Sequence, residues 1–346
     1  MTLLSETIGE IQPASEIARG QARLRLESLA MPHWALGRLL ELAESLAAMA
    51  GTIEPVFERR INIVMAGDHG VAATGVSQYP QSVTRAMVET MLSGRAAINA
   101  IAGSVDSRVV VVDMGVVGER SWSGREGFLD CRVAEGTQNI ADGPAMTGEQ
   151  AHASVEAGIQ VARSLDADIY GLGEMGIGNT TPATAVGCAL LGITAEGVTG
   201  RGTGISVEGV GKKEAVIDKA LTLNAPDAED GLDVLQKVGG FEIGGMAGFL
   251  IGAAALRKPV IIDGLISTAA ALIAQALCPR VTEWLIASHR STEPLHVKML
   301  EQLGLVPYLD LGMRLGEGTG AALTFPLVDS ATAVLRNMAT LDEVVT

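Results

Sequence analysis

Short apolar segments alternate with helical segments over most of the chain, and this alternation constrains the fold more than any other feature. The apolar segments are residues 61–65, 108–114, 167–170, 260–262 and 284–287. Residues 108–114 form a run of valines bounded by charge and glycine, which is typical of a strand buried on both faces. Strands separated by helices predict an α/β fold, a doubly wound, mostly parallel, Rossmann-like sheet.

The segments between these strands carry apolar residues at helical spacing, which predicts that they are helices. Ser82 and Ser93 are expected to cap two of the helices, and Pro182 suits the first position of another. Residues 121–145 show no clear period and are expected to be an excursion from the sheet. The expected helices are 16–49 (two helices with a turn at 32–34), 82–91, 95–101, 147–165, 182–191, 212–223, 232–238, 246–256, 267–276, 296–303 and 329–338.

The length of 346 residues exceeds the size at which a single core usually stops growing. Since the strand pattern starts only at residue 61, we expect the terminal helices to form a small second domain. We expect a small helical domain made of residues 1–55 and a C-terminal helix at about 328–346, and a large α/β catalytic domain at 56–327. Only 3% of residues are aromatic although 48% are hydrophobic, so Ala, Val, Leu and Ile must fill the core.

Charge and hydropathy argue against several partners. A net charge of −15 without a basic stripe repels nucleic acid and anionic membranes. The apolar stretches at 244–256 and 265–277 are too short to cross a bilayer. Three scattered cysteines, Cys131, Cys188 and Cys278, and an N-terminus without a secretory signal predict a cytoplasmic protein with reduced thiols. No metal-ligand spacing stands out, so no metal is expected.

A glycine-rich segment at residues 171–182 follows the third predicted strand and precedes a helix. Such a turn presents backbone N–H groups and a helix N-terminus to a phosphate. Gly176, Gly178, Asn179 and Thr180 are therefore candidate phosphate ligands, although each polar residue there could simply cap the helix. Glu174 is expected inside the turn, where its carboxylate would face a bound anion.

The same segment matches the dinucleotide fingerprint G-x-G-x-x-G, with Glu196 placed 20 residues after the last glycine. Glu174 opposes this interpretation, because a pyrophosphate would lie beside its carboxylate. A dinucleotide-dependent oxidoreductase stays open as an alternative, as does a tight turn with Glu174 in water.

Other polar residues are candidates for the same site. Glu317 lies between Gly316 and Gly318, and in an apolar pocket its carboxylate would be a stronger base. Lys213 is expected to open the helix after the glycine cluster at 200–204, where a bound anion would offset the unfavourable position of a cation. Either residue could instead lie on the surface in water. The pairs 68–69 and 288–289 and Asp263 follow strands and are expected to shape the pocket.

Taken together, five segments resemble one family. They are residues 67–71 (GDHGV), 80–84 (PQSVT), 173–183 (GEMGIGNTTPA), 237–242 (KVGGFE) and 313–322 (MRLGEGTGAA). In this order the chain resembles the nicotinate-nucleotide:5,6-dimethylbenzimidazole phosphoribosyltransferases from about residue 36 to 340. One segment departs from the family pattern, because residues 31–37 read MPHWALG where the family usually has Lys-Pro-x-Gly-Ser-Leu-Gly.

The resemblance implies transfer of the 5-phosphoribosyl group from nicotinate mononucleotide to a benzimidazole nitrogen, with loss of nicotinate and inversion at the anomeric carbon. The product, α-ribazole 5′-phosphate, supplies the lower loop of cobalamin. Glu317 falls on the catalytic base and Glu174 on the carboxylate near the ribose, where it would stabilise positive charge in the transition state. No cofactor is implied, and a homodimer is expected. A catalytically silent nucleotide-binding protein is the remaining alternative.

The resemblance also places the remaining candidates in two subsites. The phosphate and nucleotide subsite comprises Gly176, Ile177, Gly178, Asn179, Thr180, Gly202, Thr203, Gly204, Lys213, Asp263 and Ser291. The base subsite comprises Tyr79, Gln81, Ser82, Met175 and Leu315.

Overall fold

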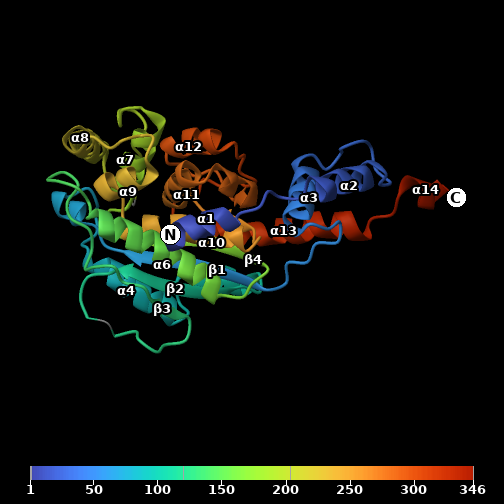
Figure 1. Cartoon of the computed structure of the whole chain (residues 1–346), viewed down its shortest axis with the longest axis horizontal. Coiled ribbons are helices and arrows are strands. Elements are labelled where there is room, and N and C mark those ends of the chain that lie inside the picture. Colours follow the sequence, from blue (N-terminus) through green and yellow to red (C-terminus); the bar gives the residue numbers. More distant parts are fainter. Residues whose placement is uncertain (1, 120, 203, 346) are drawn as a thin grey trace.

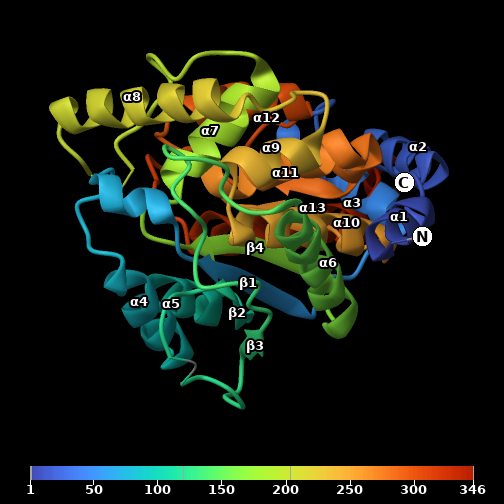
Figure 2. The ribbon, with the colours of Figure 1, turned by 60° about the vertical axis from the view of Figure 1, so that its left-hand side comes forward.

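The centre of the molecule is a parallel sheet of six strands (Figures 1 and 2). The computed structural model describes residues 2–119, 121–202 and 204–345. The sheet order is β3-β2-β1-β4-β5-β6, and every neighbouring pair is parallel, which confirms the predicted doubly wound α/β fold. The strands are β1 Arg60–Gly67, β2 Arg108–Gly115, β3 Phe128–Asp130, β4 Ile169–Met175, β5 Val260–Ile262 and β6 Leu285–Ala287.

The edge strand β3 corrects the prediction that residues 121–145 leave the sheet. β3 pairs with β2, with Phe128 opposite Val111. It has only three residues, none fully buried, so its sequence carries no apolar run that would predict a strand.

Strand β1 shows why both faces of the sheet are apolar. Ile63 and Met65 belong to the core under α6 (Gly148–Ser164) and α10 (Phe241–Ala255), whereas Val64 and Ala66 belong to the core under α4 (Ser82–Leu92) and α5 (Ala97–Ser104). Successive side chains of a strand point to opposite faces. A strand covered by helices on both sides therefore reads as a continuous apolar run.

Helices α6 and α10 pack so closely that glycine is required at their contact. A Cβ built on Gly158 of α6 would overlap the carbonyl oxygen of Gly245, and one built on Gly248 of α10 would overlap that of Val155. Small residues such as these glycines therefore allow the backbones of neighbouring helices to come into direct contact.

The remaining helices surround this centre. Helix α13 packs against β4, β5 and α5, and it also packs against α3. Helix α1 packs on α6 and α10. In Figure 1, α2, α3 and α14 form an arm that projects from the sheet, with α13 running into it. The bounds are α1 Leu3–Glu10, α2 Glu16–Glu27, α3 Arg38–Ala50, η1 Gly70–Thr74, α7 Thr180–Leu191, α8 Val207–Asn224, α9 Gly231–Val238, α11 Leu265–Leu277, η2 Pro279–Trp284, α12 Leu295–Leu303, α13 Thr319–Asn337 and α14 Leu341–Val345.

Helix α8 begins earlier than predicted, which changes the position of Lys213. Ser206 caps it by accepting a hydrogen bond from the Gly209 amide, so Lys213 lies two turns inside the helix instead of at its start. Gly209 and Gly211 weaken the helical signal of this segment, because glycine is a poor helix former.

Helix α13 also begins earlier, at Thr319, immediately after the Glu317 loop. Its first turns contain Gly320 and Pro326, which normally argue against a helix interior. The predicted start at residue 329 was therefore wrong by ten residues.

Three expectations about the first residues of helices were also wrong. Ser93 ends α4 instead of starting α5, whose N-cap position is Ala96. Helix α7 begins at Thr180, so Pro182 is its third residue instead of its first. Ser82 is the first residue of α4, and the preceding Gln81 occupies the cap position without a side-chain hydrogen bond.

The division into two domains stays a prediction, and its C-terminal boundary at residues 327/328 falls inside the continuous helix α13. Helix α1, assigned to the small domain, packs on α6 and α10 of the large one.

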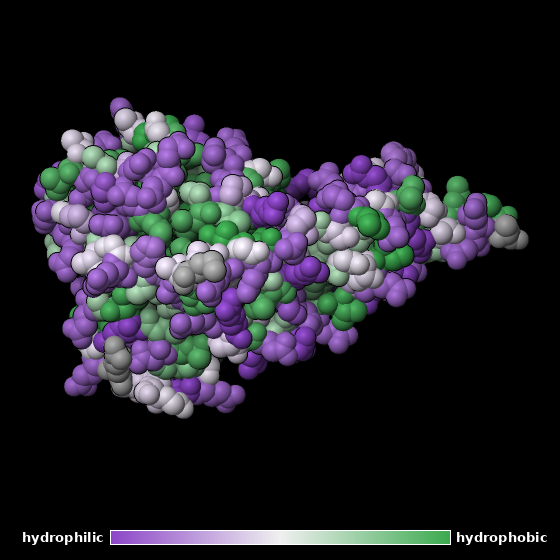
Figure 3. Space-filling model, in the orientation of Figure 1, coloured by the Kyte–Doolittle hydropathy of each residue, from purple (hydrophilic) through white to green (hydrophobic). Residues whose placement is uncertain are grey.

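Hydrophilic residues cover most of the face shown in Figure 3, with hydrophobic patches on the large lobe and on the arm. Exposed Ile17 and Leu24 of α2 belong to the arm. Among the described residues, no helix is long and apolar enough to span a bilayer.

Candidate active site

A cavity of about 380 Å³ opens at the carboxyl ends of the strands. β1 and β4 are neighbours at the centre of the sheet, and the chain turns from them in opposite directions, toward β2 and toward β5. Ligands of doubly wound sheets bind at such a switch point. The lining residues are Tyr79, Val83, Met87, Glu174, Met175, Gly176, Ile177, Asn179, Thr180, Gly202, Gly264, Leu265, Ile266, His289, Ser291, Glu293, Arg314, Leu315, Gly316 and Glu317.

Glu174 lies near the end of strand β4, which corrects its expected place inside the turn. Gly171 and Gly173 are strand residues as well, so the first half of the G-x-G-x-x-G match is not a phosphate-binding turn. The turn proper starts only at Gly176 and leads into α7.

Gly173 is needed because the loop that carries Glu317 crosses directly over it. A Cβ on Gly173 would overlap the amide nitrogen of Gly318, and one on Gly316 would overlap the carboxylate of Glu174. The Glu317 amide also donates to the Glu174 carbonyl oxygen at 3.3 Å. Close backbone contact therefore brings the two carboxylates, 143 residues apart in sequence, to one wall of the cavity.

Glu317 is held in an unusual backbone conformation. Its φ angle is +61°, in the left-handed region, and its side chain is only 4% exposed. The carboxylate accepts a hydrogen bond from the Ile98 amide at 3.3 Å, at the N-terminus of α5. Burial raises the pKa of Glu317, with the Ile98 amide acting in the opposite direction. A strained, desolvated carboxylate that lines a cavity suits a general base.

Glu174 is also buried, and this raises its pKa to about 8. A hydrogen bond from the Asn179 side chain opposes this shift, while the nearby carboxylates of Asp263, Glu242 and Glu317 add to it. Without a ligand Glu174 therefore holds a proton for much of the time at neutral pH, and a ligand with positive charge would favour its ionised form.

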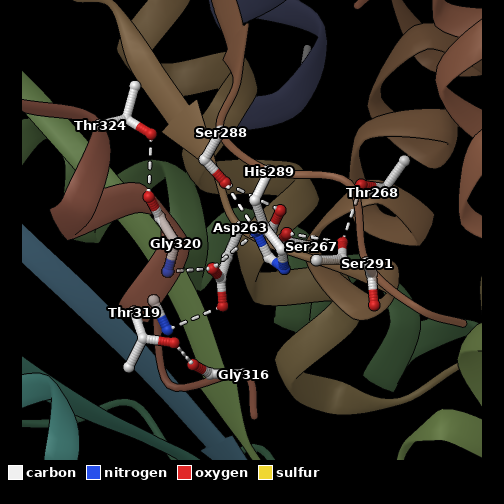
Figure 4. Close-up of polar contacts among 12 residues, drawn as sticks. Asp263, Ser267, Thr268, Ser288, His289, Ser291, Gly316, Thr319, Gly320 and Thr324 are labelled. Atoms are coloured by element: carbon white, nitrogen blue, oxygen red, sulfur yellow. Dashed lines mark hydrogen bonds and ion pairs between the residues drawn. The ribbon is translucent and has the colours of Figure 1, made fainter. Parts of the chain in front are cut away.

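Asp263 follows β5 and holds the start of α13. Its carboxylate accepts hydrogen bonds from the amides of Gly318 at 3.0 Å and Gly320 at 2.7 Å. Figure 4 shows it between Gly320 and the ring of His289. Burial raises the pKa of Asp263 to about 7. Asp263 was predicted to bind the nucleotide, but it lies behind the loop of Glu317 and does not line the cavity.

Lys213 lies behind the wall formed by Thr180 and Gly202. It is fully buried, and its ammonium group donates to the Thr180 hydroxyl at 2.7 Å and to the Gly200 carbonyl at 3.5 Å. Burial lowers the pKa of Lys213 to about 8, and the charge of Glu293 partly opposes this shift. An ammonium group has three donors, and the Thr180 hydroxyl and the Gly200 carbonyl accept two of these hydrogen bonds.

Two charged residues of this wall were missed by the sequence analysis. Glu293 accepts a hydrogen bond from the Gly202 amide at 2.9 Å, and Arg314 donates to the Gly202 carbonyl at 3.0 Å. Arg314 lies within the segment that carries Glu317, so the motif itself could have drawn attention to it. Glu293 follows β6 by six residues, and no local pattern distinguishes it.

Another part of the cavity lining is apolar. Tyr79, Val83 and Met87 come from the loop after η1 and from α4, and Met175 and Leu315 line the same cavity. Tyr79 and Leu315 are about half exposed and form its rim. Ile266, also unpredicted, extends this apolar surface from α11.

The structure brings most of the predicted site residues to this one cavity. Those that line it are Glu174, Met175, Gly176, Ile177, Asn179, Thr180, Gly202, Ser291, Leu315, Glu317 and Tyr79. Those that do not are Gly178, Gly204, Lys213, Asp263, Gln81 and Ser82. Thr203 lies outside the described residues.

The strand-end histidines differ in their surroundings. His289 lines the cavity, and burial lowers its pKa to about 4, so its ring is neutral. His69 lies below the Gly176 turn and binds the carboxylate of Glu242 at 2.7 Å. Among the described residues, no group of three or more His, Cys, Asp or Glu side chains is placed to hold a metal ion.

Comparison with known proteins agrees with this site. A model of the Phosphoribosyltransferase family (DBI_PRT) matches residues 11–345. The nicotinate-nucleotide–dimethylbenzimidazole phosphoribosyltransferase of Syntrophotalea carbinolica is 54% identical, covering 99% of this chain and 98% of the relative. That of Desulfotalea psychrophila is 50% identical with the same coverage.

A solved structure gives the same result in three dimensions. The nicotinate-nucleotide–dimethylbenzimidazole phosphoribosyltransferase from Thermus thermophilus superposes with a TM-score of 0.90 at 43% identity, covering 95% of this chain and 98% of that one. With these matches over nearly its full length, the chain belongs to the nicotinate-nucleotide–dimethylbenzimidazole phosphoribosyltransferase family.

Proposed function

We propose that this enzyme transfers the 5-phosphoribosyl group of nicotinate mononucleotide to 5,6-dimethylbenzimidazole or a related base. The products are nicotinate and α-ribazole 5′-phosphate, a step in the assembly of the cobalamin lower loop. The observation that carries the proposal is the pair of buried carboxylates, Glu174 and Glu317, on one wall of a cavity in a member of this family.

The 5′-phosphate fits the polar end of the cavity. Thr180 begins α7, whose N-terminus favours an anion, and Lys213 lies directly behind its hydroxyl. Arg314 lines the same end and supplies a second positive charge. Together these groups offset the acidity of the other cavity residues.

The aromatic acceptor fits the apolar end. A flat ring bound there would contact Val83, Met87 and Leu315, which line the same cavity as Glu317. One ring nitrogen attacks the anomeric carbon, while Glu317 takes the proton from the N–H of the other nitrogen. The raised pKa of Glu317 makes its carboxylate a stronger base for this step.

The leaving nicotinate needs no proton. The bond between the anomeric carbon and the pyridinium nitrogen breaks, and its electron pair stays on that nitrogen as the ring becomes neutral. Positive charge moves to the ribosyl centre, where an ionised Glu174 would stabilise it electrostatically. The positive pyridinium of the substrate favours this ionised form before the reaction starts.

The dinucleotide alternative is not favoured. Two glycines of its fingerprint, Gly171 and Gly173, are covered by Asn62 and by the loop of Glu317, so no pyrophosphate reaches them. A catalytically silent nucleotide-binding protein would bind the nucleotide without releasing nicotinate, and the assay below distinguishes it from an active transferase.

The test is the reaction itself. Protein is incubated with nicotinate mononucleotide and dimethylbenzimidazole, and nicotinate and the new nucleotide are followed by chromatography. We expect equal amounts of both products and dependence on the acceptor. Nucleotide binding without any release, with dimethylbenzimidazole and with adenine as acceptor, would contradict the proposal.

We also propose that the enzyme acts in the cytoplasm as a homodimer, without nucleic-acid or membrane partners. The net charge of −15 supports the last part, because it disfavours polyanionic surfaces. Light scattering after size-exclusion chromatography measures the assembly, and a monomer at micromolar concentration would contradict the dimer.

A further inference from the structure

The side chain of Glu293 is placed unusually for a phosphate-binding wall. It lies between β6 and α12, is only 5% exposed, and lines the polar end of the cavity beside Thr180, Gly202 and Ser291. A carboxylate at this position repels the anion that the wall is proposed to bind.

The carboxylate of Glu293 makes the contact that a phosphate would make. Its Oε1 atom accepts the hydrogen bond of the Gly202 amide at 2.9 Å, and its charge acts on Lys213. The absence of a side chain at Gly200 leaves the space that Oε2 occupies, because a Cβ there would overlap that oxygen. Oε2 itself has no hydrogen-bond partner among the described residues.

This arrangement is incomplete for a purely structural carboxylate. A buried carboxylate oxygen without a donor is unfavourable, and pairing both oxygens would be the stable solution. Arg314, another cation of this wall, binds the Gly202 carbonyl at 3.0 Å instead of Glu293. The contact of Glu293 is therefore one that a stronger anion can replace.

We propose that Glu293 is a specificity-determining residue that occupies the anion position of the free enzyme and must leave the Gly202 amide when a phosphate enters. The proposal rests on the proposed function only for the nature of the substrate. A nucleotide compensates for this displacement with contacts of its ribose and base, whereas free inorganic phosphate has no such contacts. Glu293 therefore keeps the subsite from filling with free phosphate.

The test measures inorganic phosphate binding directly, so it does not depend on turnover. Calorimetry with inorganic phosphate is performed on the wild type and on Glu293→Gln. The amide oxygen of glutamine can still accept from the Gly202 amide, so the wall is kept while the charge is removed. We expect phosphate to bind about tenfold more tightly to Glu293→Gln.

The matched control is Glu301→Gln, which removes the same charge from an exposed position on α12. It should bind phosphate as the wild type does. If Glu293→Gln binds phosphate no better than the wild type, or more weakly, Glu293 only supports the loop and the proposal is wrong.

Steady-state kinetics add a second readout. With Glu293→Gln we expect a KM for nicotinate mononucleotide lowered several-fold and competitive inhibition by inorganic phosphate that is about tenfold stronger. If the wild type shows no turnover, the proposed function is wrong, but calorimetry with inorganic phosphate still tests the role of Glu293. Normal turnover with unchanged phosphate inhibition in the variant would contradict the inference alone.

A crystal structure of the wild type covers the case in which the variant does not fold, with the crystal soaked in inorganic phosphate well above the wild-type Kd that calorimetry gives. We expect phosphate on the Gly202 amide and the Glu293 carboxylate rotated away from it. Phosphate bound in the cavity while the bond between Glu293 and Gly202 persists would overturn the proposal.

Discussion

At the scale of single residues, the site is a set of carboxylates held away from water. Glu174, Glu317 and Asp263 all have raised pKa values because they are buried. Their environments differ, since Asp263 is fixed by two amides at the start of α13 while Glu174 and Glu317 line the cavity. The difference separates a residue that positions the loop from the two that we propose to contact the substrate.

Glu317→Gln tests the base. The amide keeps the size of the side chain but cannot take up the proton of the acceptor base, so we expect kcat to fall about 10²–10⁴-fold while the Kd for nicotinate mononucleotide stays within a few-fold. Single-turnover kinetics and calorimetry measure the two quantities. Glu229→Gln, at an exposed position before α9, is the control, and an unchanged kcat in Glu317→Gln would remove Glu317 from this role.

The pH dependence of substrate capture tests Lys213. Its pKa is lowered to about 8, so above this pH the free enzyme loses the charge that is proposed to attract the phosphate. Ionisation of Glu174, whose pKa is also raised to about 8, acts in the opposite direction. Lys213→Arg isolates the contribution of Lys213, because a guanidinium stays protonated over this range. We therefore expect the ratio of kcat/KM for nicotinate mononucleotide in the wild type to that in Lys213→Arg to fall as pH rises through about 8, and a ratio that is constant from about pH 7 to 9 would contradict this role.

At the scale of elements, the site depends on how the Glu317 loop touches β4. This loop lies on Gly173 and ends in α13, whose first amides are held by Asp263. Residues 171–175, which were expected to belong to the phosphate-binding turn, are thus the part of β4 that supports the Glu317 loop. The strand can serve in this way because its glycines leave room for the loop backbone.

Gly173→Ala tests this contact. The new methyl group would overlap the Gly318 amide and push the loop away from β4, so we expect at least about a hundredfold loss of kcat/KM from misplacement of Glu317. The control is Gly211→Ala in α8, where a methyl group meets nothing within 4 Å and should stabilise the helix by up to about 1 kcal/mol. Wild-type kinetics in Gly173→Ala would show that the contact does not position Glu317.

At the scale of the whole molecule, the parallel sheet gathers segments from most of the chain at one edge. The cavity takes residues from as far apart as Tyr79 and Glu317. Because the strands are parallel, all of their carboxyl ends meet there, and the reversal of direction between β1 and β4 leaves the space for a ligand.

Binding should therefore stabilise the molecule as a whole. Nicotinate mononucleotide at about 100 times its Kd is expected to add about 2.7 kcal/mol to the free energy of unfolding, because it binds only the folded state. Thermal unfolding with and without ligand measures this, and nicotinic acid at the same concentration is the control. Glu317→Gln should keep the rise in Tm, and Lys213→Met should lose most of it. Equal rises in both variants would contradict the assignment of Lys213 to the phosphate.

The sequence by itself determined the order of most strands and helices and the two glutamates of the site, but it missed β3, α1 and α14. Apolar periodicity is a local property, so the strands β1, β2, β4, β5 and β6 could be predicted from it, and the family resemblance is confirmed by the comparisons. Glu174 and Glu317 stand out because they lie in glycine-rich segments.

Only the tertiary structure decided which residues meet. Nothing local to Glu293 shows that it binds the Gly202 amide, and nothing local to Asp263 shows that it holds the start of α13. Gly173 could be read as part of a turn until the Glu317 loop was seen to cover it. The physical reason is that a residue's conformational preference depends on its neighbours in sequence, whereas its contacts depend on how distant segments pack.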